Sequence, residues 1–227
     1  GLGDVYKRQI VVAVGERFNQ SGEAKSRADI TVNANQQLLV KELKKTGKTV
    51  IVLLMGGRPM IFNDMEPHAD AILLTWWLGT ESGNAIADII SGDYNPSGKL
   101  PMTFPAHVGQ IPVYYNYKST GRPESKTVAY SCRYQDIDFE PAYPFGYGLS
   151  YTTFQLSEPK TSANVYTMED TIRVSAKLKN TGVYRGKETV QLYIRDLVAS
   201  VTRPVKELKG FQQIESVSYT HLRAHET

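Results

Sequence analysis

The stretch "KTVIVLLMGG", residues 48–57, is an apolar, partly β-branched run that ends in two glycines. Polar and turn-forming residues bound it, with "KKTG" on one side and "RP" on the other. A continuous apolar run of this length is typical of a strand that is buried on both faces. Such strands belong to parallel sheets covered by helices, so residues 48–57 predict a central strand of an α/β domain.

The segments on either side of this strand alternate between strand and helix patterns. Short apolar runs predict strands at 10–15 and 69–77, and helical spacing predicts helices at 33–47 and 83–92. In the first helix, the predicted buried stripe consists of Leu38, Leu39 and Leu43. Strands that alternate with helices of this length pair in parallel through right-handed crossovers. The prediction for residues 10–150 is therefore a layered α/β/α sandwich with a mostly parallel sheet. It includes, at about 101–150, a connector rich in Pro, Gly and Tyr that we expect to be ordered loop.

The second half of the chain changes its period. Residues 171–180, "TIRVSAKLKN", alternate strictly between apolar and polar side chains, and residues 188–196 repeat the pattern. Residues 205–214 could form a further strand. Short alternating strands with turn residues between them predict an antiparallel, immunoglobulin-like sandwich over 151–216. Three or four strands are too few to close such a sandwich, so we expect this all-β domain to be truncated.

Both ends of the chain look like translated sequencing-adapter DNA. Codons for Asp4–Gln9 exist whose opposite strand, read in a shifted frame, encodes "VSYTH" at 217–221. We therefore set residues 1–9 and 217–227 apart from the fold and expect the chain to be an internal piece of a longer gene. His221 and His225 have the spacing of two metal ligands on a helix, but they lie in this tail. No metal site is predicted.

Composition excludes several classes of protein. Lys and Arg number 26 and Asp and Glu 23, a net charge of +3 that is too balanced to indicate a nucleic-acid partner. The longest apolar stretches are shorter than the roughly 18 residues that a membrane span needs. The single cysteine, Cys132, cannot form an internal disulfide and is predicted to be a small packed side chain.

Several long motifs carry a family resemblance. "WWLGTESGNAIADIISGDYNPSGKLPMTFP" at 76–105, "IPVYYNYKSTGRP" at 111–123 and "YPFGYGLSYTTF" at 143–154 occur in this order. With "SGEAKSRADI" at 21–30, they resemble the C-terminal part of glycoside hydrolase family 3, β-glucosidase type. "VTRPVKELKGFQ" at 201–212 resembles the fibronectin type III-like domain that follows in many of those enzymes. The resemblance covers essentially all of residues 10–216.

The resemblance implies a retaining β-glycosidase that uses no cofactor. It implies that Glu23, in the "SGE…SR" motif, is the proton donor and acid/base residue, with Glu16 as a weaker alternative. The nucleophilic aspartate would come from an N-terminal (β/α)8-type barrel that is missing from this chain, so we expect the chain alone to be inactive. The expected substrate is an oligosaccharide or glycoside with a terminal non-reducing β-D-glucosyl residue, and the expected location is the periplasm or the medium.

Two further residues are candidates for substrate binding. Trp77 is able to stack on a sugar ring, although a tryptophan at a strand end more often belongs to a core. Glu81 lies in a glycine-flanked loop, where it would either contact the substrate or cap the following helix.

Other readings of the whole chain stay open. Within the same family, the specificity could be that of a β-xylosidase, an α-arabinofuranosidase or a β-N-acetylglucosaminidase. A protein of another class, a non-catalytic carbohydrate-binding or structural protein, could be built from the same domains.

Overall fold

In the computed structural model, residues 8–167, 169–216 and 219–226 are described, the last of these ranges by its backbone only. The chain divides into two compact units, and the division passes through helix α2 and the connector. Unit 1 comprises residues 1–87, 102–113 and 136–143, and unit 2 comprises residues 88–101, 114–135 and 144–227.

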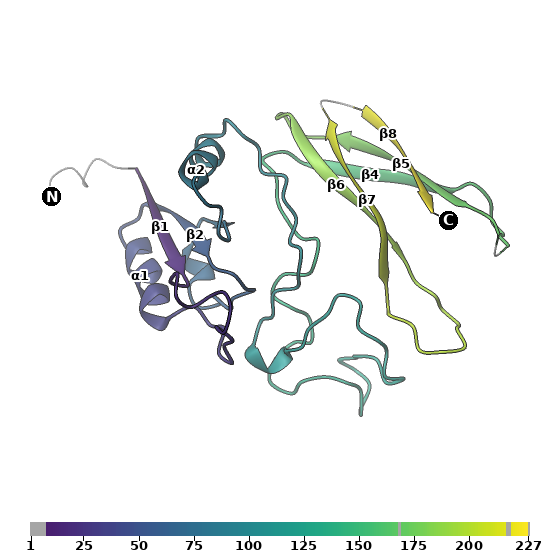
Figure 1. Ribbon diagram of the computed structural model, residues 1–227, viewed down its shortest axis with the longest axis horizontal. Helices are drawn as coiled ribbons and strands as arrows, with labels where there is room; N and C mark the ends of the chain where they lie inside the picture. The colour runs from purple at the N-terminus through teal and green to yellow at the C-terminus, as the bar shows by residue number, and fades with distance from the viewer. Residues whose placement is uncertain (1–7, 168, 217–218, 227) are drawn as a thin grey trace. The chain divides into compact units, whose positions relative to one another are not determined.

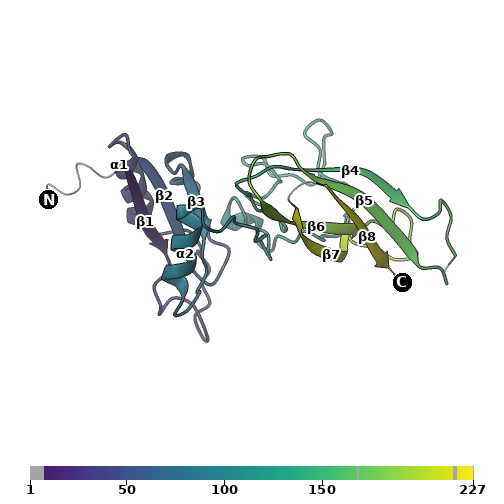
Figure 2. The same ribbon diagram turned by 90° about the horizontal axis from the view of Figure 1, so that it is seen from above.

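Unit 1 is built on a parallel sheet of three strands in the order β1-β2-β3 (Figure 2). Every second residue of the central strand, Val50, Val52 and Leu54, is buried, and the residues between them are half-buried. Helix α1 packs against this strand, and β1 and β3 pair with its two edges. The predicted parallel α/β domain is thus confirmed. The bounds are Gln9–Gly15 for β1, Thr49–Met55 for β2 and Ala71–Leu74 for β3.

Helix α1, Ala34–Lys44, packs against β1 and β2 (Figure 1). It begins at Asn33, whose side chain accepts a hydrogen bond from the backbone of Asn35. The predicted buried stripe is wrong for Leu38 and Leu39, which are exposed, while Leu43 is half-buried. The buried positions of this helix are Gln37 and Val40. Gln37 tolerates burial because its amide donates to the Val32 carbonyl and accepts from the backbone of Asp64.

Aromatic side chains pack at the carboxyl side of β3. Phe62 stacks on Tyr143, and Phe104 meets Phe62 and Trp76 edge to face. Phe104 and Tyr143 also form a backbone bridge, so this part of the connector is ordered loop, as expected. The remaining elements of this region are the 3₁₀ turns η2, Glu66–His68, and η3, Val108–Gln110, and helix α2, Ser82–Ser91.

Unit 2 is antiparallel, as the alternating patterns predict. Its strands form one sheet in the order β4-β5-β8 and a second of β6 and β7 (Figure 1). Leu178 and Ile214 are buried, and Phe154 and Val190 pack against them. The strands are β4 (Phe154–Thr161), β5 (Ile172–Asn180), β6 (Gly186–Ile194), β7 (Glu207–Ser216) and β8 (Tyr219–Glu226).

Two of these strands, β4 and β8, were not predicted from the sequence. The segment of β4 lacks a strict alternation, and β8 lies in the tail that was set apart from the fold. Backbone pairing explains β8, since without it one edge of β5 would offer unpaired N–H and C=O groups to any extended segment.

The connector contributes to unit 2 through residues 114–135. Tyr115 stacks on Phe145 and meets Tyr193 edge to face. Cys132 is exposed and hydrogen-bonds to the Thr120 hydroxyl, so the prediction of a packed cysteine is wrong. The large apolar residues of the same loop, such as Val128 and Tyr130, are themselves exposed.

Candidate active-site loop

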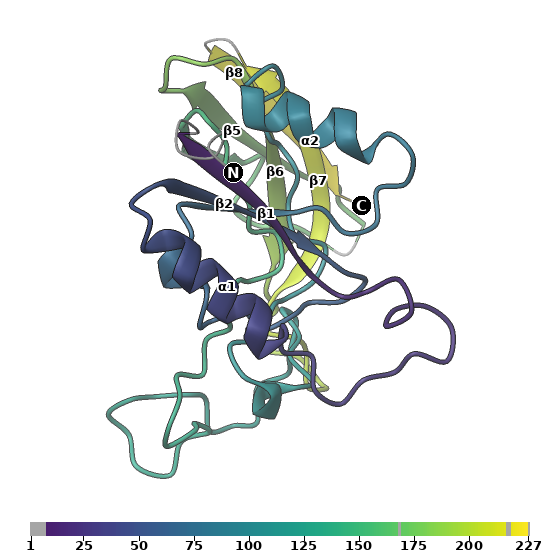
Figure 3. The ribbon, with the colours of Figure 1, turned by 90° about the vertical axis from the view of Figure 1, so that its left-hand side faces the viewer.

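The loop that carries Glu23 starts at the carboxyl edge of the parallel sheet and returns to α1 (Figure 3). Gly15 ends β1 with a φ of +126°, and a Cβ there would lie 1.9 Å from the Met55 carbonyl oxygen. Only glycine fits this backbone and this close approach. The Gly15 amide then donates to the Gln36 side chain at 3.0 Å, and the amide of Glu16 donates to Met55 at 2.9 Å. The loop therefore leaves the sheet at a fixed point.

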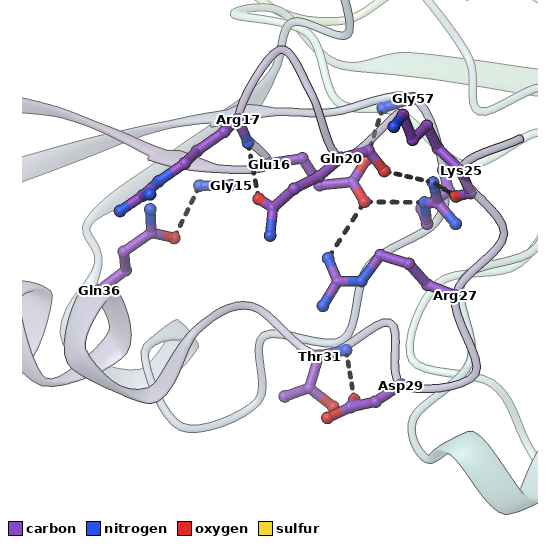
Figure 4. A network of polar contacts seen from close by, with 11 residues as sticks. Gly15, Glu16, Arg17, Gln20, Lys25, Arg27, Asp29, Thr31, Gln36 and Gly57 are labelled. Carbon is purple, nitrogen blue, oxygen red and sulfur yellow. Dashed lines mark hydrogen bonds and ion pairs between the residues drawn. The ribbon is translucent and has the colours of Figure 1, made fainter. Parts of the chain in front are cut away.

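Glu16 is the buried charge of this edge, with a side chain 1% exposed. Its carboxylate points toward Arg27 (Figure 4). Its Oε1 lies 3.2 Å from Arg27 Nη1 and 2.8 Å from Arg58 Nε. Its Oε2 accepts a hydrogen bond from the backbone of Gly57 at 3.2 Å. The Arg58 N–H at Nε is not directed at an acceptor, so its contact with Glu16 is an ion pair rather than a hydrogen bond. A buried carboxylate is tolerated where it is paired in this way.

Arg58 connects this buried charge to the loop. Its Nη2 donates to the carbonyl oxygens of Gln20 and Lys25, each at 2.8 Å. Both acceptors are backbone groups, and they flank Glu23 on its two sides. The loop also approaches Gly57, where a Cβ would lie 2.0 Å from the Ser21 hydroxyl.

Glu23 itself is exposed and lies in a turn next to Ala24, whose φ is +56°. Within the described part of the chain, its carboxylate makes no hydrogen bond and no ion pair. Arg27, which follows it in the same motif, is directed at Glu16 instead. The two candidate carboxylates thus differ in kind: Glu16 is paired and buried, while Glu23 is presented outward.

The next polar residues hold the return of the loop to the sheet. Asp29 accepts a hydrogen bond from the backbone of Thr31 at 2.8 Å (Figure 4). Hydrogen bonds from the Thr31 side chain and backbone lower the pKa of Asp29, and the charge of Arg27 adds to this. Asp29 therefore stays ionised, and it has a local structural role.

The two predicted substrate-binding residues, Trp77 and Glu81, lie in different surroundings. Trp77 is 45% exposed, and its Nε1 lies 3.2 Å from the point that a Cβ of Gly57 would occupy. Trp77 and Ser21 therefore flank the same glycine beside the loop. Glu81 is exposed and accepts a hydrogen bond from the Asn84 side chain at 2.6 Å, while its carbonyl accepts from Ala85 at the start of α2.

The described residues offer no clustered ligand set for a metal ion. No group of three or more His, Cys, Asp or Glu side chains suited to a metal occurs among the described residues. The side chains of His221 and His225 lie outside those residues. No helix of the described chain is long and apolar enough to cross a membrane.

Arg58 is the functional candidate that sequence reasoning missed. The segment "MGGRP" follows the central strand directly, and the sequence patterns predicted no role for its arginine. The available signal was an arginine directly after a strand that ends in glycines, since the carboxyl ends of parallel strands collect functional residues at one edge.

Comparison with known proteins defines the class. The profile described as "Glycosyl hydrolase family 3 C-terminal domain" matches residues 6–151, and "Fibronectin type III-like domain" matches residues 188–218. The chain belongs to glycosyl hydrolase family 3, of which it carries the C-terminal domain, as the motifs predicted.

Individual relatives agree with this assignment. The chain is 49% identical over 207 residues to a periplasmic β-glucosidase from Salmonella typhimurium, and 42% identical over 209 residues to a β-xylosidase from Formosa agariphila. The alignments cover 90% of this chain, but only 27% and 28% of those relatives. The crystal structure of a β-glucosidase from Listeria innocua in complex with glucose superposes with a TM-score of 0.92 at 40% identity, covering 98% of this chain and 32% of that one.

Proposed function

We propose that this chain is the acid/base part of a retaining β-glycosidase and that Glu23 is its proton donor. The observation that carries the proposal is the contrast between two carboxylates at one sheet edge. Glu16 forms ion pairs with two arginines. Glu23 is exposed and unpaired among the described residues, and Arg58 binds the backbone of its loop. A general acid must be accessible to the substrate and still be held in place.

The chemistry needs a second carboxylate. In a retaining glycosidase, one carboxylate attacks the anomeric carbon while the other protonates the leaving oxygen, and the glycosidic C–O bond breaks. Water then attacks the glycosyl–enzyme ester, and the acid/base residue takes up its proton. We propose that an aspartate on a barrel domain outside this chain is the nucleophile, because the chain spans less than a third of the relatives it matches.

The proposed substrates are terminal β-D-glucosides. Support comes from the relatives, which include β-glucosidases from Salmonella typhimurium and Bacteroides ovatus, and from a Listeria innocua β-glucosidase solved with glucose. The Formosa agariphila relative is a β-xylosidase, so an aryl β-xyloside belongs in every assay. Trp77, beside the loop, is proposed as a stacking surface for the sugar. Export to the periplasm is proposed from the Salmonella relative's name.

The decisive experiment compares Glu23→Gln with the unaltered sequence in a protein that joins this chain to its barrel domain. We expect kcat to fall about 10²–10⁴-fold on substrates with poor leaving groups. The fall should be smaller for a dinitrophenyl glucoside, whose leaving group needs no protonation. Added azide should restore turnover and yield the β-glucosyl azide, because azide attacks the intermediate without a general base.

The same assay tests the rival class. The 227-residue chain by itself should give no turnover. Equal activity of Glu23→Gln and the unaltered enzyme on every leaving group would overturn the role of Glu23. Sugar binding without any turnover in the barrel-containing protein would favour a non-catalytic carbohydrate-binding protein.

A further inference from the structure

We propose that Arg58 is the positioning residue of the Glu23 loop: it ties the two backbone carbonyls that flank Glu23 to the buried carboxylate of Glu16. This inference rests on the proposed function for its catalytic consequence. Its structural part, the fixing of the loop, stands without that function. Arg58 touches no reacting atom and acts only through the geometry of the loop.

The first step is the fork of the guanidinium. The Nη2 atom carries two N–H groups, and it has two acceptors, Gln20 O and Lys25 O, each at 2.8 Å. The donors of Nη2 are thereby used in full, and the chain between the two acceptors is closed into a short loop with Glu23 inside it. A lysine ammonium is a single point charge on a flexible stem and lacks this planar geometry.

The second step is the anchor. Arg58 Nε lies 2.8 Å from Glu16 Oε1, and the Glu16 side chain is 1% exposed while that of Arg58 is 18% exposed. Glu16 is the first residue after β1. Gly57, whose amide donates to Glu16, is the second residue after β2. The anchor is therefore part of the rigid edge of the sheet, and the fork transfers that rigidity to the loop.

The third step is the fit of the loop on Gly56 and Gly57. A Cβ on Gly56 would lie 3.3 Å from Glu16 Oε2 and 2.6 Å from Met60 Cε. A Cβ on Gly57 would lie 2.0 Å from the Ser21 hydroxyl. The absence of side chains at Gly56 and Gly57 therefore leaves room for the loop and Glu16 beside the end of β2, and for the Arg58 side chain that joins them.

Hydrogen exchange on the 227-residue chain tests the structural part without any need for activity. The reporters are the amides of Gln20 and Lys25, which donate within the loop to Arg17 O at 2.9 Å and Gly22 O at 3.3 Å. In Arg58→Met, exchange of loop amides should rise about tenfold or more, because hydrogen bonds from a charged donor are lost. Arg58→Lys should show the same direction of change while the amides of β2 keep their protection.

The matched control is Arg133→Met. Arg133 donates to the backbone carbonyl of Lys126 in the connector at 3.0 Å, so it makes the same kind of contact elsewhere. Its loss should leave the Glu23 loop unchanged. Unchanged loop exchange in Arg58→Lys and Arg58→Met would overturn the proposal. Faster exchange throughout β2 in both variants would overturn it as well, since Arg58 would then stabilise the whole sheet.

A kinetic arm, in the protein that includes the barrel, tests the positioning role. Arg58→Lys should lower kcat about tenfold or more on a poor leaving group, with KM within about twofold and a smaller loss on a dinitrophenyl glucoside. A loosened loop with unchanged kcat would overturn the catalytic consequence. If Glu23→Gln has no effect, the proposed function fails, while the exchange result still decides whether Arg58 fixes the loop.

Discussion

Two long loops of this chain are alike in exposure and different in anchoring. Residues 17–29 and residues 119–135 contain no buried residue, and neither forms a helix or strand. The first is held by Arg58 and Glu16, which come from two strand ends far apart in the sequence. In the second, the hydrogen bonds of Arg122, Ser125 and Cys132 join residues of the same segment.

The difference shows how an exposed loop becomes suitable for chemistry. Exposure alone leaves a carboxylate accessible and poorly placed. Exposure with an anchor in a buried charge leaves it accessible and fixed, which is what preorganisation requires. The variants below test this contrast, and unit 1 can be followed alone because both tryptophans of the chain, Trp76 and Trp77, belong to it.

The largest effect is expected from Gly15→Ala, with Gly121→Ala as its counterpart in the connector. Gly15 has a φ of +126° and a Cβ position 1.9 Å from Met55 O, whereas Gly121 has a φ of +80° and nothing within 4 Å. Urea titration followed by tryptophan fluorescence should show Gly15→Ala destabilising unit 1 by about 3 kcal/mol or more. Gly121→Ala should leave that transition unchanged. Equal effects of the two variants would remove the distinction between the loops.

A smaller loss is expected from Glu16→Ala. It leaves Arg27 and Arg58 without their shared partner, and both are partly exposed, so the loss should be about 2–3 kcal/mol, below that of a fully buried pair. The control is Glu124→Ala in the connector, expected within about 0.5 kcal/mol. The same fluorescence titration is run on both variants, and because Glu124 belongs to unit 2, its substitution should leave the unit 1 transition unchanged. A loss under about 0.5 kcal/mol for Glu16→Ala would show that the buried carboxylate does not anchor this edge.

The smallest effect concerns the opposite edge of the same sheet. Lys44 Nζ lies 2.7 Å from both carboxylate oxygens of Asp70, which also accepts from the Val50 amide at 2.8 Å. The hydrogen bond from Lys44, followed by that from Val50, lowers the pKa of Asp70 below its ordinary value of 3.8. Because the folded-state pKa is the lower one, the stabilisation is present above pH 3.8 and is lost as pH falls through the folded-state pKa.

Asp70→Asn should therefore be less stable than the unaltered chain at neutral pH, and the gap should narrow as the pH falls below about 4. Urea titrations at a series of pH values measure the gap. Lys44→Met serves as the second arm of a double-mutant cycle, whose coupling should disappear in acid. A gap that stays constant from neutral to acid pH would contradict the assignment.

Much of the fold could be predicted from local pattern. The apolar runs at 10–15, 48–57 and 69–77 predicted the three parallel strands, although one face of β2 is only half-buried and Val11 of β1 is exposed. Strict alternation of apolar and polar residues predicted β5 and β6, because successive side chains of a strand point to opposite faces of the sheet. The stripe of α1 was predicted wrongly, since Gln37 satisfies its amide through Val32 and Asp64 and occupies a place that Leu38 was expected to take.

The sequence by itself determined the alternation of elements, the membership in glycosyl hydrolase family 3 and Glu23 as the candidate proton donor, because periodicity and motif are properties of neighbours along the chain. Only the tertiary structure decided that Glu16 is buried with Arg27 and Arg58, and that Arg58 holds the carbonyls on both sides of Glu23. The physical reason is the short range of the interactions that hold these residues together. Hydrogen bonds and buried ion pairs act over a few ångströms, and parallel pairing of β1 and β2 is what brings residues 41 positions apart within that distance.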